Sequence, residues 1–148
     1  LLCEVRDRKI EIMPTDNVHD TLFFGYVNRN GHLGLNINNR NPRHPDIYAG
    51  KLVHRFVEYA EENNIPITAI EGSWTSLGDN YQTFVQYLDK IATERKITED
   101  DERGAANETW TGLLAHSLGY RNTVILDNGR ESNVVNTRFS KAQTIFVA

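Results

Sequence analysis

The first 40 residues carry short runs of apolar and β-branched side chains separated by polar turns, a pattern typical of antiparallel strands. Residues 2–5 and 9–13 flank a short polar turn and predict a hairpin. Residues 21–27 and 32–37 predict a second hairpin, because the Asn-Arg-Asn-Gly turn at 28–31 tolerates positive φ.

A strand–helix–strand unit is predicted over about residues 32–74. Residues 38–45 hold two prolines and three asparagines and predict an irregular loop, whose last proline suits the first turn of a helix. Apolar residues at helical spacing continue that helix to the asparagines at 63–64, which suit a C-terminal cap. Residues 66–71 then predict a strand. Two strands joined by one helix are normally parallel, with a right-handed crossover.

Two more helices are predicted after a loop at residues 72–78. The first has its apolar face between residues 81 and 92. The second begins at Thr98, before three acidic residues that favour a first turn, and extends to Leu118 before a glycine. Within this last helix we expect Trp110 in the core and His116 on the surface.

One of the two threonines that flank the tryptophan, Thr109 and Thr111, is expected to face outward. A last hairpin is predicted from strands at 122–126 and 133–139, around an Asp-Asn-Gly turn.

The whole pattern indicates an α+β or α/β fold: a mixed, largely antiparallel sheet with N-terminal hairpins, one β-α-β unit and three helices. The length of 148 residues matches one domain, residues 1–148. Because the chain begins in a strand-like stretch without an initiator methionine, we expect it to be a fragment of a longer polypeptide.

Charge and composition exclude several classes of protein. The formal net charge of −4 provides no general attraction to phosphates, so nucleic acid is disfavoured as a partner. The single cysteine, Cys3, cannot form an internal disulfide and is expected to be packed rather than nucleophilic. No apolar run approaches the ~20 residues that span a bilayer, and no signal peptide is visible. Motifs for nucleotide phosphates, for zinc and for a nucleophile elbow are missing.

Polar and charged side chains gather in two loops, 38–46 and 71–80, which follow the two strands of the predicted β-α-β unit. Ligands of open α/β sheets bind beyond the C-terminal ends of the strands, so the sequence predicts a cleft between these loops. The candidate residues of this cleft are Arg40, Arg43, His44, Glu71, Ser73, Trp74, Asp79 and Asn80.

Catalysis in this cleft is assigned to Glu71 as general base, together with His44 and Asp79. The other candidates are expected to bind substrate, since cations at a helix N-terminus hold anions and an aromatic loop residue lines pockets. They are Arg40, Arg43, Trp74, Ser73 and Asn80. Each candidate also has a structural interpretation: a solvated loop, a helix cap for Asp79, or core for Trp74.

Residues 46–126 contain four short motifs: Ile-Glu-Gly-Ser-Trp at 70–74, Asn80 followed by Phe84, Thr-Trp-Thr-Gly at 109–112 and Gly-Tyr at 119–120. These motifs resemble the toxin-like modules at the C-terminal end of bacterial polymorphic toxins such as Rhs-repeat proteins. The resemblance implies an effector that is secreted or delivered into a target cell as part of a larger protein. It also implies a cognate immunity protein as a partner.

The order of elements is also similar to the acetyltransferase fold of the GNAT superfamily. In that fold a helix N-terminus holds the pyrophosphate of acetyl-CoA, and the corresponding loop here would be residues 40–50. This sequence departs from the pattern, because Gly50 is the only glycine there and two prolines intervene. Acetyl-CoA is expected as a cofactor only if the GNAT-like interpretation holds.

Three functions stay open. The first is an effector or toxin-like enzymatic domain, a transferase or hydrolase, acting on a small-molecule or macromolecular substrate between loops 38–46 and 71–80. The second is a GNAT-like acyltransferase. The third is a non-catalytic module that recognises a protein partner, which predicts an exposed apolar patch instead of a polar cleft.

Overall fold

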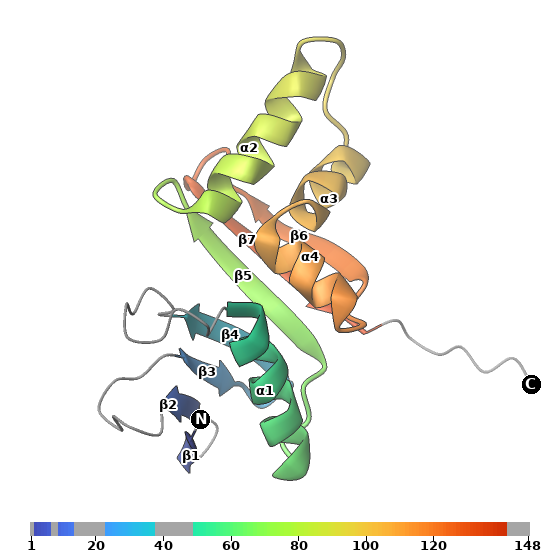
Figure 1. Ribbon diagram of the computed structural model, residues 1–148. Helices are drawn as coiled ribbons and strands as arrows, with labels where there is room; N and C mark the ends of the chain where they lie inside the picture. The colour runs from blue at the N-terminus through green and yellow to red at the C-terminus, as the bar shows by residue number, and fades with distance from the viewer. Residues whose placement is uncertain (1, 7–8, 14–22, 38–48, 142–148) are drawn as a thin grey trace, which may run out of the picture. The chain divides into compact units, whose positions relative to one another are not determined.

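The computed structural model describes residues 2–6, 9–13, 23–37 and 49–141 (Figure 1). The chain divides into two compact units, residues 1–68 and 69–148, each with its own strands and helices. The expectation of one domain over residues 1–148 stays a prediction.

The first unit contains a four-stranded antiparallel meander in which each strand pairs with the next along the chain. Both predicted N-terminal hairpins are therefore confirmed. The strands are β1 (Leu2–Arg6), β2 (Lys9–Met13), β3 (Phe23–Val27) and β4 (His32–Ile37).

The turn between β3 and β4 has the chemistry that the sequence predicts. The Asn28 side-chain oxygen accepts hydrogen bonds from the backbone N–H of Asn30, at 2.9 Å, and of His32, at 3.0 Å. Gly31 has a φ of 81° and donates its N–H to the Asn28 carbonyl at 2.9 Å. A side chain at Gly31 would be strained at this φ, so glycine fixes the turn.

The helix of the first unit is α1 (Ala49–Glu62), which buries Leu52, Val53 and Phe56. Its C-terminal cap is confirmed: Asn64 has a φ of 57°, and the next N–H, that of Ile65, bonds to the Ala60 carbonyl at 2.9 Å. This six-residue closure with a left-handed asparagine is the Schellman arrangement. The loop predicted at 38–45 lies outside the described residues.

The second unit has a three-stranded antiparallel sheet with β7 (Val134–Ser140) in the middle, between β5 (Ala69–Thr75) and β6 (Asn122–Asn128). The predicted C-terminal hairpin is confirmed, but Asp127 and Asn128, which were expected in its turn, are the last two residues of β6. The strand predicted at 66–71 is displaced along the chain. It begins at Ala69 and continues to Thr75. The Gly-Ser pair at 72–73 suggests a loop, yet Gly72 and Trp74 continue the alternation of buried positions that starts at Ile70.

Three helices cover one face of this sheet (Figure 1). They are α2 (Asp79–Ala92), α3 (Glu99–Asn107) and α4 (Trp110–Ser117). The core between helices and sheet contains large side chains that are at most 6% exposed, among them Ile70, Trp74, Phe84, Val135 and Phe139.

The single helix predicted over 98–118 is wrong, because the chain forms two helices with a break at Glu108 and Thr109. Thr109 explains the break. It is fully buried, its hydroxyl donates to the Ala106 carbonyl at 2.6 Å and accepts from the Gly112 N–H at 3.0 Å, and it thereby caps α4.

The break also changes which side chains of the following residues face the core. Trp110, expected in the core, is 43% exposed. Thr109 and Thr111, of which one was expected to face outward, are both buried. Both expectations assumed the periodicity of a continuous helix, and the chain restarts its periodicity at Thr109.

The mixed α+β class with largely antiparallel strands is confirmed, and the described residues contain four helices in place of the three expected. The predicted parallel pairing within the β-α-β unit concerns β4 and β5, which belong to different units. That pairing stays a prediction, as does the likeness to the GNAT fold.

Thr98→Ala should lower the free energy of unfolding by about 1 kcal/mol. The Thr98 hydroxyl accepts the Asp101 N–H at 3.3 Å, while the Asp101 carboxylate accepts the Thr98 N–H at 2.8 Å, a reciprocal capping box at the start of α3. Urea unfolding followed by circular dichroism measures the change. Thr98→Ser keeps the hydroxyl and should remain within a few tenths of a kcal/mol of the natural chain; an equal loss in both variants would contradict the capping role.

Candidate binding groove

Of the eight residues predicted to form a cleft, the structure describes five: Glu71, Ser73, Trp74, Asp79 and Asn80. Arg40, Arg43 and His44 lie outside the described residues. Glu71 is inside β5 rather than at its end, opposite Arg138 of β7. Its Oε1 lies 3.1 Å from both Nε and a terminal nitrogen of Arg138, so the carboxylate holds two strands together on the outer face of the sheet.

Trp74 is a core residue, which settles the choice between a pocket and the core. Its side chain is 6% exposed, and its ring centroid lies 6.3 Å from that of Phe84 and 6.5 Å from that of Phe139. Gly72 makes room for it, because a Cβ there would lie 2.7 Å from the indole nitrogen.

Only residues 76–78 of the predicted loop 71–80 form a turn between β5 and α2. Asp79 is exposed in the first turn of α2, and the N-cap is Gly78, which makes no side-chain cap bond. The expectation that Asp79 caps this helix is therefore wrong. Ser73 is exposed on the outer face of β5.

Asn80 makes structural contacts that tie two helices together. Its amide nitrogen donates to the Thr111 hydroxyl at 2.9 Å, and its oxygen accepts the Thr111 N–H at 3.2 Å. Both ends of the amide are thus used to join α2 to the start of α4.

A second polar cluster, which sequence reasoning missed, joins α3, α4 and β6. The Thr123 hydroxyl donates to the Asn107 side-chain oxygen at 2.5 Å and lies 3.3 Å from His116 Nε2. The His116 ring also meets Phe139 edge to face, at 6.2 Å between centroids. His116 is therefore half-buried rather than a surface residue, and the cluster fixes the helices over β6.

The described part of the second unit contains a groove of about 430 Å³ between α3 and β6. One wall is formed by Glu99, Glu102 and Arg103, and the other by the six consecutive residues 123–128. Side chains of a strand alternate between two faces. Six consecutive residues therefore line one groove only if the groove follows the edge of the strand, where backbone N–H and C=O groups lie.

The edge of β6 that faces this groove has no strand beside it among the described residues, since β7 is the only strand paired with β6 there. The pairing with β7 slips by one residue between Ile125 and Asp127, so Leu126 is the extra residue of a β-bulge. Leu126 and Val124 are 49% and 40% exposed. The groove therefore combines a free strand edge with two accessible apolar side chains.

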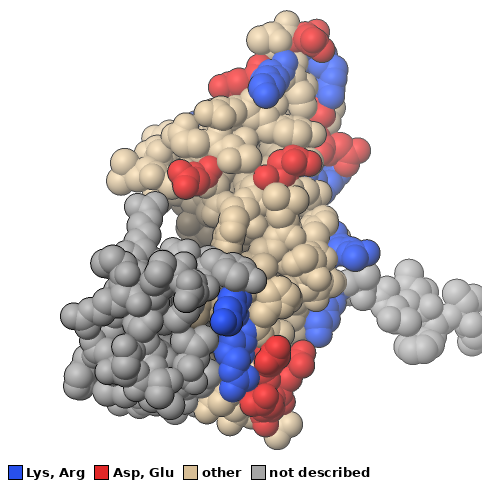
Figure 2. Space-filling model, viewed as in Figure 1, with Lys and Arg blue, Asp and Glu red and all other residues tan. Residues whose placement is uncertain are grey.

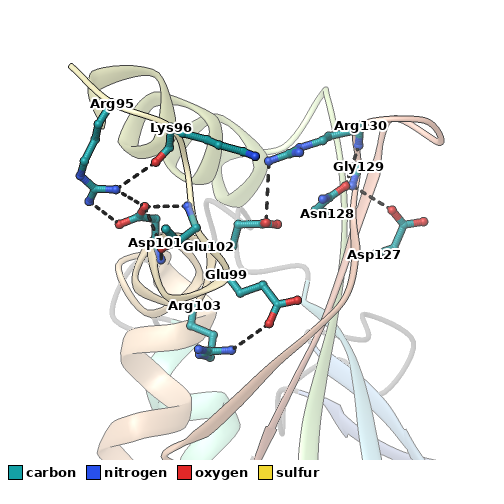
Figure 3. A network of polar contacts seen from close by, with 11 residues as sticks. Arg95, Lys96, Glu99, Asp101, Glu102, Arg103, Asp127, Asn128, Gly129 and Arg130 are labelled. Carbon is teal, nitrogen blue, oxygen red and sulfur yellow. Dashed lines mark hydrogen bonds and ion pairs between the residues drawn. The ribbon is translucent and has the colours of Figure 1, made fainter. Parts of the chain in front are cut away.

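The α3 wall is held in place by a charged network at its N-terminus (Figure 3). Arg95 donates to both oxygens of Asp101, at 2.6 and 2.7 Å. These bonds, together with the Thr98 N–H, hold the pKa of the Asp101 carboxyl well below its usual range. The carboxylate thus stays charged at neutral pH and fixes the first turn of α3.

The far end of the groove is fixed by the turn that follows β6. The Asp127 carboxylate accepts the Gly129 N–H at 2.9 Å and the Ser132 hydroxyl at 2.9 Å. The hydrogen bond from Gly129 is the main cause of the lowered pKa of Asp127. Arg130, in the same turn, reaches back to α3, where its guanidinium lies 3.8 Å from the carboxylate of Glu102 (Figure 3).

The described Lys and Arg side chains do not join into one broad basic surface on the face shown in Figure 2. They lie in small groups beside Asp and Glu side chains. No three His, Cys, Asp or Glu side chains lie together as metal ligands would within residues 2–6, 9–13, 23–37 and 49–141. None of the helices in these same ranges is long and apolar enough to cross a membrane.

Comparisons with known proteins identify no relative. No protein-family model matches the chain, no curated protein matches it, and no solved structure matches its fold. The resemblance to Rhs-type toxin modules and the similarity to the GNAT order of elements thus stay hypotheses.

Proposed function

We propose that the second unit, residues 69–148, is a binding module that holds an extended segment of a partner protein in the groove between α3 and β6. The observation that carries the proposal is the lining of the groove by six consecutive strand residues, 123–128, opposite a helix. Strand edges beside a helix bind extended peptides, because the backbone supplies hydrogen bonds and the flanking side chains supply specificity.

The dimensions of the groove support a peptide as the ligand. Six strand residues span about 20 Å, the length of a six-residue extended segment. A volume of about 430 Å³ is within the range of ligand sites. A pocket for a small molecule is mostly apolar and enclosed, whereas six of the nine residues that line this groove are polar or charged.

Two exposed apolar side chains, Val124 and Leu126, supply contacts that a protein partner would bury. Such side chains inside a polar rim are the usual composition of a binding surface. They supply part of the exposed apolar patch that is expected of a non-catalytic module.

The enzymatic hypothesis has less support from the described residues. Glu71 is paired with Arg138, Asn80 with Thr111, and Trp74 is core. Its other central residues, Arg40, Arg43 and His44, lie outside the described residues, so that hypothesis stays untested.

A displayed library of random peptides, selected on the full 148-residue chain, tests the function. We expect enriched peptides whose affinity falls at least about tenfold with Leu126→Lys, because a charge replaces an apolar contact at the centre of the groove. Leu77→Lys is the matched control, since Leu77 is 97% exposed and lies on the turn between β5 and α2, away from the groove lining.

Two results would contradict this function. One is a selection that enriches no peptide for the folded chain. The other is a set of enriched peptides that bind the Leu126→Lys and Leu77→Lys variants equally well, which would place their site outside the groove.

A further inference from the structure

We propose that the segment bound in the groove is basic and adds to the free edge of β6 as a fourth strand of this sheet. The inference rests on the binding function proposed above and specifies the chemistry of the partner. It follows from two separate features, the backbone of β6 and the charges along the groove.

The backbone argument begins with the position of β6 at the end of the sheet. In the part of the chain that the structure describes, β6 has β7 on one side and the groove on the other. In an edge strand, the residues that do not bond to the neighbouring strand direct their backbone N–H and C=O away from the sheet. For β6 these groups point away from β7. A peptide in the groove can satisfy these groups only in an extended conformation.

The bulge at Leu126 determines how far such pairing extends. Bulges bend a strand and interrupt its ladder, and they protect free edges from indiscriminate pairing. We infer that an added strand pairs with residues 123–125, which line the groove, and then contacts the exposed Leu126 side chain. The bulge therefore favours a short segment over a second long sheet.

The charge argument concerns the groove lining, which has three carboxylates, Glu99, Glu102 and Asp127, against one guanidinium, Arg103. Arg103 lies 3.9 Å from the Glu99 carboxylate and also pairs with Asp100 on the solvent side. Glu102 is 7% exposed and has Arg130 at 3.8 Å. Glu99, whose side chain is 90% exposed, and the long Glu102–Arg130 contact leave negative charge available to a cationic partner.

Lysine side chains on alternate residues of an added strand would all point to one face. A peptide in which lysine and valine alternate can thus present cations to α3 and valines to the other face. The chemistry that the groove recognises is that of a short, extended, alternating basic segment.

Four synthetic peptides test the proposal on the full chain by fluorescence anisotropy. The first alternates lysine and valine, and the second alternates glutamate and valine. The third and fourth are the lysine–valine peptide with N-methyl groups on every lysine or on every valine. N-methylation removes backbone donors from one edge of an extended peptide and leaves the other edge intact.

We expect the lysine–valine peptide to bind at least about tenfold more tightly than the glutamate–valine peptide, with a difference that shrinks as salt is raised. One of the two N-methylated peptides should lose at least about tenfold in affinity, while the other retains it, because only one edge pairs with β6. Equal binding of both methylated peptides and their parent would overturn strand addition. Equal binding of the lysine and glutamate peptides would overturn the basic character.

A matched pair of variants locates the charge. Glu99→Gln should weaken binding of the lysine–valine peptide about two- to fivefold, because Glu99 lines the groove. Glu94→Gln should leave the binding of this peptide unchanged, because Glu94 is also exposed in the second unit but does not line the groove. Failure of all four peptides, while library peptides still bind and respond to Leu126→Lys, would overturn the basic strand and leave the binding function standing.

Discussion

Gly112→Ala should destabilise the second unit by about 3 kcal/mol or more, at the upper end of what overpacking costs. A Cβ at Gly112 would lie 2.1 Å from the Ala106 carbonyl oxygen and 2.9 Å from Asn107 Cα. These are backbone atoms, which cannot rotate away as a side chain can. Alanine would normally gain about 1 kcal/mol over glycine in a helix, so the steric cost decides the sign.

The clash would also break the connection between α3 and α4. The Gly112 N–H donates to the Thr109 hydroxyl, and that hydroxyl donates to the same Ala106 carbonyl that the new Cβ would meet. Moving Ala106 away would leave buried polar groups without partners, each costing about 1–3 kcal/mol. Relief of the clash therefore has its own cost.

Urea unfolding followed by tryptophan fluorescence measures this effect, since both tryptophans of the chain, Trp74 and Trp110, belong to the second unit. Gly104→Ala is the matched control. The atoms nearest to a Cβ there belong to the Tyr87 side chain, whose hydroxyl, at 2.9 Å, is the far end of a side chain that can shift. We expect the control to stay within about 1 kcal/mol of the natural chain. A Gly112→Ala chain as stable as the control would contradict the close packing at this junction.

Phe139→Ala should lower the free energy of unfolding by about 3–5 kcal/mol, as substitutions of other fully buried phenylalanines do. Phe139 is 0% exposed on the central strand β7. Its ring lies 6.5 Å from the Trp74 ring and 6.2 Å from the His116 ring, so its removal opens a cavity between the sheet and the helices.

The same fluorescence-detected unfolding measures the loss for Phe139→Ala. Phe139→Leu retains most of the volume and should cost about 1.5 kcal/mol or less. A loss below about 1 kcal/mol for the alanine variant would mean that Phe139 does not sit at the centre of this core.

Local sequence patterns predicted the elements that depend on local chemistry. The turn at Asn28 and the start of α3 at Thr98 rest on side chains that bond to nearby backbone. Gly31 and Asn64 instead adopt the left-handed backbone conformation that glycine and asparagine tolerate. The break between α3 and α4 was missed because Thr109 turns its hydroxyl inward to cap α4, and an apolar stripe continues in the sequence across it. Periodicity alone cannot show that a second helix begins within a continuous apolar stripe.

The candidate site depended on long-range pairing, which the sequence does not specify. Glu71 and Asn80 were assigned to a cleft as polar residues in a loop, but their partners, Arg138 and Thr111, are 67 and 31 residues away. The groove was missed for the same reason. Residues 122–126 predict a strand, and nothing in them predicts that this strand lies at the end of the sheet and beside α3.

The fold also determines which variants can test the enzymatic hypothesis. Trp74→Ala would remove a core side chain, so loss of activity in that variant would report unfolding instead of chemistry. The outer-face pair of Glu71 and Arg138 is the more informative target, because its side chains are about one-third exposed.

Amide hydrogen exchange in the full chain, measured by NMR with and without the tightest peptide from the displayed library, tests the binding groove most directly. We predict that added protection appears at amides of residues 122–128 on β6 and at the groove-facing turn of α3, while amides of β5 keep their rates. Protection that appears elsewhere, or unchanged exchange along β6 at saturating peptide, would contradict the groove as the binding site.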